Sequence, residues 1–387
     1  MSFSFTAFLT ILFFSSISII LMYFFLQNNK LIKGLGIGTL SFCIFVIVIR
    51  LLIPFEFSFE NNLVCKRLFP KIIFFFKTPI LKLNGHNICP LHIMGLIWLM
   101  GSIIQLSRAI IIYENFTKVI NKFPAVKNSE IQGALRKVLQ NYSKPMSFKI
   151  IQANLISTPM VLGMRKPWIV IPQIELSENE WYYIFSHEVA HYYHGDLLIK
   201  VIVELLCIIY WWNPYIYLLR GQVSKVLEIH TDLTATKSMG ESKRIEYLEC
   251  LLKIAKYHPS TRVNKVALNF DSENVSTLSQ RFHIVLQNSN QKEKFKLKNV
   301  FFMVMPVLLL VVLSFCFVFE PYSISPKDAS DTVELTKENS YLVKNQDNTY
   351  DLYVNNKFFG TVKDIKNLDV SLPIYKNIKE VQKDEKK

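Results

Sequence analysis

The stretch 185-FSHEVAHYYHGD-196 concentrates three histidines, a glutamate and an aspartate in a chain that is otherwise mostly apolar. If it forms a helix, His187 and His191 lie four residues apart on one face, with Glu188 beside them. Two imidazoles with this spacing can share one zinc ion, and the glutamate between them can act as the general base of a hydrolase. The stretch therefore predicts an enzyme with one zinc ion per chain.

A zinc hydrolase normally needs a third protein ligand, and the segment 224-SKVLEIHTDLTAT-236 offers Glu228. Asp232 follows it by one helical turn, where its carboxylate can accept a hydrogen bond from a ligand imidazole. We therefore predict that His187, His191 and Glu228 bind the zinc and that Asp232 orients one of the histidines. A solvated helix face is the simpler interpretation of Glu228 and Asp232, but their joint occurrence with the histidine motif disfavours it.

Other arrangements of the same motif are excluded by the neighbouring residues. A metzincin would have glycine at position 194 and histidine at position 197, where this chain has His194 and Leu197. An intramembrane protease would carry the histidines inside a span, and this stretch is too polar for that. We interpret His194 as a neighbour of the metal or a surface residue, and Asp196 as a supporting residue that holds the end of the metal helix.

The segment 165-RKPWIVIP-172 predicts a β-strand just upstream of the metal helix. Ser177, followed three residues later by Glu180, is a capping box that predicts the start of the helix. A second strand is predicted in 148-FKIIQAN-154 and a helix over residues 129–140. The strand before the metal helix is a candidate edge for pairing with an extended substrate, although an ordinary core strand fits equally well. Its residues are Trp168, Ile169, Val170 and Ile171.

The composition indicates a membrane protein, because the chain is 51% hydrophobic, contains 30 Phe and is only 19% charged. Four apolar runs, 5–26, 35–54, 91–113 and 300–319, are each about 20 residues long, enough to cross a bilayer. The first run is expected to be an anchor and not a cleaved signal. A fifth run, 197–219, is interrupted by charged residues and proline, and we interpret it as a buried or interfacial helix pair.

The lysine-containing segments 27–33 and 291–299 indicate which loops are cytoplasmic. The predicted fold is mainly α, with four transmembrane helices, a cytoplasmic α+β domain and a small β-rich extracellular tail. Residues 1–113 form three spans with an exterior loop at 55–90, 114–298 the metallopeptidase domain, 299–319 the fourth span and 320–387 the tail, with a hairpin around Asn355. Both termini are predicted to lie outside. The exterior loop is an exception to the rule that positive charge gathers in cytoplasmic loops, because it contains several lysines.

The net charge of +14 suggests contact with anionic lipid and acidic partners. No helix-turn-helix or stacking-aromatic signature accompanies the cations, so no direct nucleic acid binding is expected. Cys65 and Cys89 share the exterior loop, where either a disulfide or two free thiols would be compatible with the sequence.

The chain resembles the BlaR/MecR-type antirepressor membrane metallopeptidases of bacterial cell membranes. The resemblance rests on 157-STPMVLGMRKPWIVIP-172, 187-HEVAHYYHGD-196, 211-WWNPYIY-217 and 228-EIHTD-232, in this order. It implies a gluzincin-like peptidase fold with His187, His191 and Glu228 on the zinc and Glu188 as catalytic base. It also implies cytoplasmic cleavage of the protein itself, within 257–298, and of a small winged-helix repressor. A homodimer is left open.

The C-terminal part departs from the members of that family that sense β-lactams. Those members carry a large penicillin-binding domain with a Ser-x-x-Lys nucleophile, and residues 320–387 contain no such motif. We therefore expect a member that lacks this sensor domain. Two alternatives remain: an HtpX-type peptidase that removes misfolded membrane proteins, and a non-proteolytic receptor in which the zinc is only structural.

Overall fold

The structure is a computed structural model, mainly helical, that divides into two compact units, Met1–Glu320 and Pro321–Lys387. Each unit is considered by itself. The structure describes residues 5–55, 61–65, 68–83, 86–144, 146–257, 275–287, 297–321, 335, 339–345, 349–355, 357–362 and 372–375. Most of the lysine-rich segment 291–299, much of the predicted self-cleavage region 257–298 and the chain after residue 376 lie outside the described residues.

Among the described residues, two helices are long and apolar enough to cross a membrane, α1 (Phe5–Gln27) and α5 (Pro90–Ile120). The other two predicted spans form shorter apolar helices, α3 (Ile37–Leu52) and the Val304–Cys316 part of α12 (Leu297–Cys316). α3 is shortened because Gly36, with φ 73°, separates it from α2 (Asn29–Leu35). α12 ends where the chain becomes extended as β7 (Phe317–Pro321).

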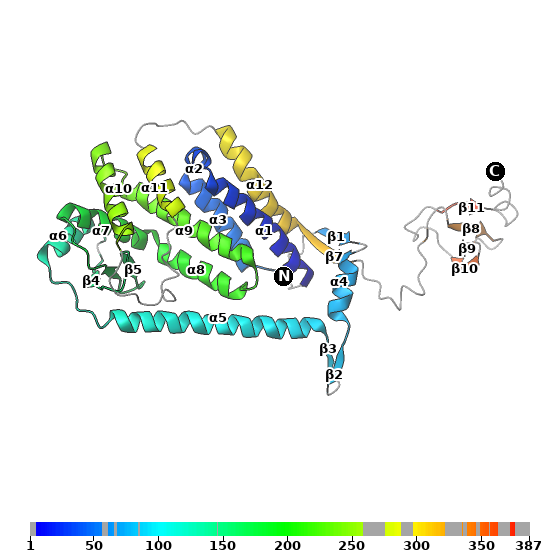
Figure 1. Ribbon diagram of the computed structural model, residues 1–387. Coiled ribbons are helices and arrows are strands. Elements are labelled where there is room, and N and C mark those ends of the chain that lie inside the picture. Colours follow the sequence, from blue (N-terminus) through cyan, green and yellow to red (C-terminus); the bar gives the residue numbers. More distant parts are fainter. Residues whose placement is uncertain are drawn as a thin grey trace. The chain divides into compact units, whose positions relative to one another are not determined.

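Helices α1 and α3 pack against α9 (Pro214–Ala235), and α12 packs on α1 and α3, around a shared apolar core that also includes α8 (Asp196–Ile209) (Figure 1). Polar contacts fix this arrangement, since Tyr210 Oη donates to the Leu51 carbonyl at 2.8 Å and Gln222 Nε2 to the Ile19 carbonyl at 2.9 Å. The fifth apolar run forms the predicted helix pair, α8 and the start of α9. The helix that carries Glu228 therefore packs directly on the first candidate span.

The segment between α3 and α5 is built from short elements. These are β1 (Asn61–Cys65), which pairs with β7, α4 (Leu68–Lys77), and the hairpin of β2 (Leu81–Leu83) and β3 (His86–Ile88). Cys89 is a free thiol whose Sγ donates to the Lys77 carbonyl at 3.0 Å. Of the two alternatives left open by the sequence, the structure therefore has the free thiol and not the disulfide with Cys65.

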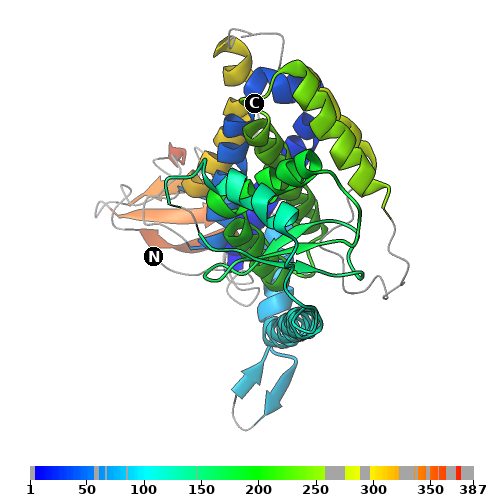
Figure 2. The ribbon, with the colours of Figure 1, turned by 90° about the vertical axis from the view of Figure 1, so that its left-hand side faces the viewer.

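Helix α5 exposes most of its apolar side chains and extends along one edge of the other helices (Figures 1 and 2). Its contact with α8 and the turn after it includes two indoles, each of which donates a hydrogen bond to a backbone carbonyl across the contact. Trp98 Nε1 donates to the Ile209 carbonyl at 2.7 Å, and Trp211 Nε1 donates to the Trp98 carbonyl at 3.2 Å. Gly101 makes room for this contact, because a Cβ there would lie 2.3 Å from the Trp211 ring.

The peptidase part contains helix α6 (Ser129–Leu139) and a three-stranded sheet of β4 (Lys149–Gln152), β5 (Met160–Leu162) and β6 (Trp168–Ile171). The strand order is β4-β6-β5, with β6 parallel to β4 and antiparallel to β5. The prediction that Trp168–Ile171 forms an edge strand is therefore wrong. Both sides of β6 are already hydrogen-bonded, because the β5 segment, which the sequence analysis did not identify as a strand, folds back against it.

Three more helices complete the first unit: α7 (Glu178–His194), α10 (Glu241–Ala255) and α11 (Val275–Gln287). Together with α6 and the sheet they bury a second apolar core, which contains Phe185, Val189, Leu248 and Val285. α11 packs on both α9 and α10. As a result, α9, α10 and α11 gather around the middle of α7.

The second unit is a small four-stranded sheet. Its strands are β8 (Ser340–Lys344), β9 (Tyr350–Val354), β10 (Lys357–Val362) and β11 (Ile374–Tyr375), in the order β10-β9-β8-β11. The predicted hairpin is confirmed: β9 and β10 are antiparallel, and Asn355 at their turn has φ 49°, a conformation that asparagine adopts readily. The β-rich character predicted for the tail is confirmed as well.

Candidate metal centre

Helix α7 begins and ends at well-defined capping residues. Ser177 Oγ accepts from the Glu180 backbone N–H, and the Ser177 N–H donates to Glu180 Oε2 at 2.7 Å, which confirms the predicted capping box. The helix ends at Gly195, whose φ of 76° and ψ of 20° are left-handed and favour glycine. Since α8 begins at the next residue, this turn brings Asp196 back beside His191.

The structure brings together the imidazoles of His187 and His191 with the carboxylate of Glu228. The two Nε2 atoms are 3.1 Å apart, and they lie 3.2 Å and 3.5 Å from the nearer Glu228 oxygens. A tetrahedral zinc with bonds of about 2.0–2.1 Å would separate its ligand atoms by roughly 3.3 Å. The donor atoms and their spacing therefore fit a zinc ion, and we call these three residues the His-His-Glu cluster.

On one side of the cluster, His191 is held by Asp196 and Thr231. His191 Nδ1 lies 2.6 Å from Asp196 Oδ2, and the Thr231 hydroxyl donates to the same oxygen at 3.3 Å. Because a carboxylate only accepts, His191 donates its Nδ1 proton to Asp196, and Nε2 is the ring atom that remains for a metal ion. Asp196 was predicted to hold the end of the metal helix, and its direct contact with the ring was not foreseen.

On the other side, His187 contacts a buried network that includes Asp232. Tyr247 Oη donates to Asp232 Oδ1 at 2.6 Å and lies 2.9 Å from His187 Nδ1, so it accepts the Nδ1 proton of the histidine. His187 Nδ1 is also 3.2 Å from Asp232 Oδ1. Arg281 on α11 completes the network by donating through Nε and Nη2 to the two Asp232 oxygens, at 2.6 Å and 2.8 Å.

The electrostatics of the cluster favour positive charge at its centre. Burial by itself lowers the pKa of His187, but hydrogen bonds and charge from Asp232 and Glu228 outweigh burial and raise it to about 10. Burial likewise would raise the pKa of Glu228, whereas His191, His187 and Arg281 hold it well below its usual value. Two carboxylates therefore stabilise a positive charge between them, carried either by protons or by a divalent cation.

Glu188 lies beside His187 on α7 and is only 8% exposed. Within the part of the chain that the structure describes, its carboxylate has no hydrogen bond or ion pair. Such a group is free to exchange a proton with a bound reactant.

His194 lies outside the His-His-Glu cluster. This agrees with the prediction that it is a neighbour of the metal or a surface residue and not a ligand. Its ring packs at 4.5 Å between centroids on that of His230, which points away from Glu228 on α9. His194 Nδ1 is buried and has no hydrogen-bond partner among the described residues. Burial and the neighbouring His230 ring lower the pKa of His194.

Three residues of the site were missed from the sequence: Thr231, Tyr247 and Arg281. Tyr247 lies in a helical segment with apolar neighbours, where a tyrosine is indistinguishable from an ordinary core residue. Arg281 is a single cation in α11, and most arginines at such positions lie in solvent. No sequence spacing relates either helix to α7, so only tertiary packing identifies these two partners.

The sequence profile of the family described as BlaR1 peptidase M56 matches residues 76–285. The matched range contains the whole His-His-Glu cluster together with Tyr247 and Arg281. It begins in α4 and ends within α11.

Individual relatives are similar at lower coverage. Regulatory protein BlaR1 of Bacillus licheniformis is 24% identical over 178 residues, which cover 46% of this chain and 30% of that protein. The methicillin resistance mecR1 protein of Staphylococcus aureus strain Mu50 is 26% identical over 230 residues, 57% of this chain and 38% of the relative. Regulatory protein BlaR1 of Staphylococcus aureus is 24% identical over 242 residues, which cover 62% of this chain and 40% of that protein. The matched region spans less than half the length of these relatives.

Proposed function

The chain belongs to the BlaR1 peptidase M56 family, and on this premise we propose that it is an integral-membrane zinc endopeptidase that transmits an exterior signal by cleaving protein inside the cell. The observation that carries the proposal is the His-His-Glu cluster, in which the two Nε2 atoms are 3.1 Å apart and each lies 3.2 Å or 3.5 Å from an oxygen of the Glu228 carboxylate. Both imidazoles have their Nδ1 protons bound elsewhere, which leaves their Nε2 lone pairs for a metal ion. Membership of a peptidase family supports a hydrolytic use of that ion.

His187, His191 and Glu228 would hold the zinc ion, which as a Lewis acid supplies polarisation of the substrate carbonyl and activation of water at neutral pH. Glu188 takes the proton from the attacking water and returns it to the leaving amine. Asp196 and Asp232 keep the two imidazoles in the tautomer and orientation that this requires. A general base of this kind contributes a factor of about 10²–10⁴ to the rate.

The substrate main chain pairs with β5 in this proposal, in place of β6. No described strand pairs with the outer side of β5. β5 packs on α7, and the Tyr192 hydroxyl, next to His191, donates to the Met164 carbonyl just after the strand at 2.9 Å. An extended peptide added to this edge would run past the metal helix, with main-chain hydrogen bonds providing affinity.

The arrangement in the membrane follows from the candidate spans and the charged loops. We place residues 1–113 and 299–319 in the membrane and 320–387 outside. Residues 114–298 lie in the cytoplasm, except that α8 and the first part of α9 pack beside the spans α1 and α3. The substrates are the chain itself and a small winged-helix repressor, as the family resemblance implies. A peptidase that releases a repressor in this way couples an exterior event to transcription without binding nucleic acid.

The test combines metal analysis with a time course of self-cleavage in the purified full-length protein. We expect about one zinc per chain and fragments that accumulate in the wild type and not in Glu188→Gln. Glu178→Gln is the matched control, since it changes an exposed carboxylate at the start of the same helix.

Three outcomes would contradict the proposal. Fragments that form equally in Glu188→Gln would show that another protease is responsible. Signalling in cells that persists in Glu188→Gln would favour a non-proteolytic receptor with a structural zinc. Accumulation of misfolded membrane proteins, with no change in any repressor, would favour the quality-control alternative.

A further inference from the structure

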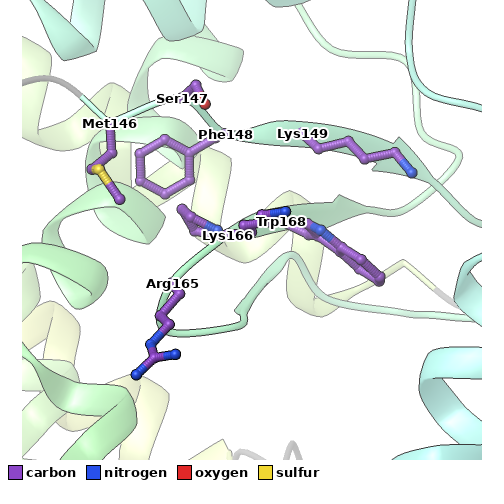
Figure 3. Close-up of a pocket in the computed structure, with 8 residues that line it drawn as sticks. Met146, Ser147, Phe148, Lys149, Arg165, Lys166 and Trp168 are labelled. Atoms are coloured by element: carbon purple, nitrogen blue, oxygen red, sulfur yellow. The ribbon is translucent and has the colours of Figure 1, made fainter.

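A groove of about 390 Å³ lies where the start of β4 faces the turn between β5 and β6 (Figure 3). Lys149 and Trp168 extend together on one side of it, whereas Met146, Phe148 and Arg165 lie toward the other. It is distinct from the His-His-Glu cluster, and the proposed zinc chemistry does not use it.

The groove is lined by three cations and no acidic side chain. Lys149, Arg165 and Lys166 are exposed, and none of them forms an ion pair with a carboxylate within the described parts of the chain. By contrast, the exposed Lys137 on α6 pairs with Glu178, and Lys253 on α10 pairs with Glu180. The groove is therefore a concentrated, uncompensated positive site that would attract an anionic group.

Aromatic surface lies directly beside these cations. The Lys149 ammonium is 5.3 Å from the centroid of the Trp168 ring, a cation–π distance, and Phe148 forms part of the lining. Such a combination accommodates a carboxylate together with the apolar stem or the neighbouring apolar residue of a peptide. A site for a simple ion would not need the aromatic surface.

The turn that carries two of the cations is conformationally defined. Gly163 has φ 82°, and a Cβ there would lie 2.8 Å from the Lys166 carbonyl oxygen, so the turn depends on glycine at this position. Arg165 and Lys166 are thereby held on a short, tight connection between two paired strands. Less conformational freedom is then lost when they bind a ligand.

The groove is joined to the helix that carries the catalytic residues. Phe148 packs edge-on against Tyr192, with ring centroids 5.2 Å apart. Tyr193 Oη accepts from the Met146 N–H at 3.0 Å and donates to the Lys144 carbonyl at 2.7 Å. On the other side of the groove, the Tyr192 hydroxyl donates to the Met164 carbonyl just before Arg165. Both tyrosines directly follow His191, so both walls of the groove are attached to the end of α7.

We propose that this groove recognises an acidic residue of the protein substrate and thereby selects substrates with acidic side chains near the scissile bond. The inference rests on the proposed peptidase function, because it assigns a specificity site to that reaction. A peptide on the free edge of β5 would continue toward the β5–β6 turn and reach Arg165 and Lys166. This continuity with α7 and β5 favours a peptide over an anionic lipid headgroup as the occupant.

The experiment uses the full-length protein in phosphatidylcholine nanodiscs and a set of fluorogenic peptides in which each position near the cleaved bond carries Glu, Gln or Lys in turn. For at least one position, we expect kcat/KM for the Glu peptide to exceed that for the Gln peptide by about tenfold. The double variant Arg165→Glu/Lys166→Glu should lose this preference and favour Lys. The matched control is Lys237→Glu/Lys243→Glu, two exposed lysines away from the groove, which should keep it.

A binding measurement separates failure of this inference from failure of the proposed function. A labelled acidic peptide should bind the inactive Glu188→Gln protein, and the two groove substitutions added to it should weaken that binding about tenfold. If peptides are cleaved with no difference between Glu and Gln at any position, the groove assignment is wrong. If the groove substitutions change only binding to phosphatidylglycerol nanodiscs, the site recognises lipid and the inference is also overturned. If nothing is cleaved but the binding difference holds, only the peptidase proposal fails.

Discussion

Helix α7 buries ionisable side chains, whereas helix α5 exposes apolar ones. The middle of α7 buries His187, Glu188 and His191 within the protein, whereas α5 exposes a long series of leucine, isoleucine, methionine and tryptophan side chains. At α7 most buried polar atoms have a designated partner. The apolar side chains of α5 have almost no packing partners, apart from the contact with Trp211.

The difference shows that the two helices are suited to different solvents. Burying ionisable groups is costly in a protein unless each charge is paired, and the two histidines of α7 satisfy this through helices α8, α9, α10 and α11. Exposing large apolar side chains is costly in water and favourable in lipid, which is the behaviour of a membrane-spanning helix. The chain therefore combines a charge network, which tertiary contacts stabilise, with a helix whose exposed apolar side chains are suited to lipid.

The largest expected effect concerns the charge network. Arg281→Met removes the cation that donates to both Asp232 oxygens and leaves the carboxylates of Asp232 and Glu228 buried without it. We expect a loss of about 3–5 kcal/mol in the free energy of unfolding, because an uncompensated buried charge remains. Denaturant unfolding in detergent measures it.

Arg220→Met is the control for this prediction. Arg220 is partly exposed, pairs with Glu204 at 3.2 Å, and should contribute less than about 1 kcal/mol. Equal losses in the two variants would mean that the network near the metal helix is no more tightly coupled than a surface ion pair.

An intermediate effect is expected where α5 contacts the turn after α8. Gly101→Val places side-chain atoms where the Trp211 ring lies and should destabilise this contact by about 1–3 kcal/mol through overpacking. Gly95→Val on the same helix is the control, since nothing lies within 4 Å of its Cβ position. The melting temperature and the tryptophan emission maximum report the change. If both valine variants behave alike, the indole contact does not hold α5 in place.

The smallest effect concerns the first turn of α7 and its dependence on pH. Burial would raise the pKa of Glu180, but hydrogen bonds from Lys253 and Ser177 outweigh burial and lower it. Because the folded-state pKa is lowered, the carboxylate contributes stability above its unfolded-state pKa of about 4.3 and loses that contribution as the pH falls through the folded-state value. We expect a contribution below about 1 kcal/mol, since Lys253 and Glu180 are partly exposed.

Unfolding of the wild type and of Glu180→Gln, measured between neutral and acidic pH, checks this prediction. The two proteins should differ near neutral pH and converge in acid. Glu249→Gln, an exposed glutamate on α10, should follow the wild type throughout. A difference for Glu180→Gln that is constant with pH would show that the capping geometry matters and the charge does not.

Local sequence features predicted the elements that depend on neighbouring residues. The capping box of Ser177 and Glu180, the strands within 148–154 and 165–172, the helix at 129–140 and the hairpin at Asn355 were all recognisable, because their signals lie within a few residues of each other. The spacing of His187 and His191 belongs to the same class, since a helix by itself places residues four apart on one face.

Contacts between distant segments were determined by tertiary structure alone. The sequence could propose Glu228 by elimination, but the partners Tyr247 and Arg281 come from helices that no spacing relates to α7. The central position of β6 depends on β5, a three-residue strand too short to carry a periodic signal. The sequence by itself thus determined the chemistry that is available and the helix that presents it. Which charges are compensated, and which strand edge stays open, depends on packing, because burial brings side chains together irrespective of their separation along the chain.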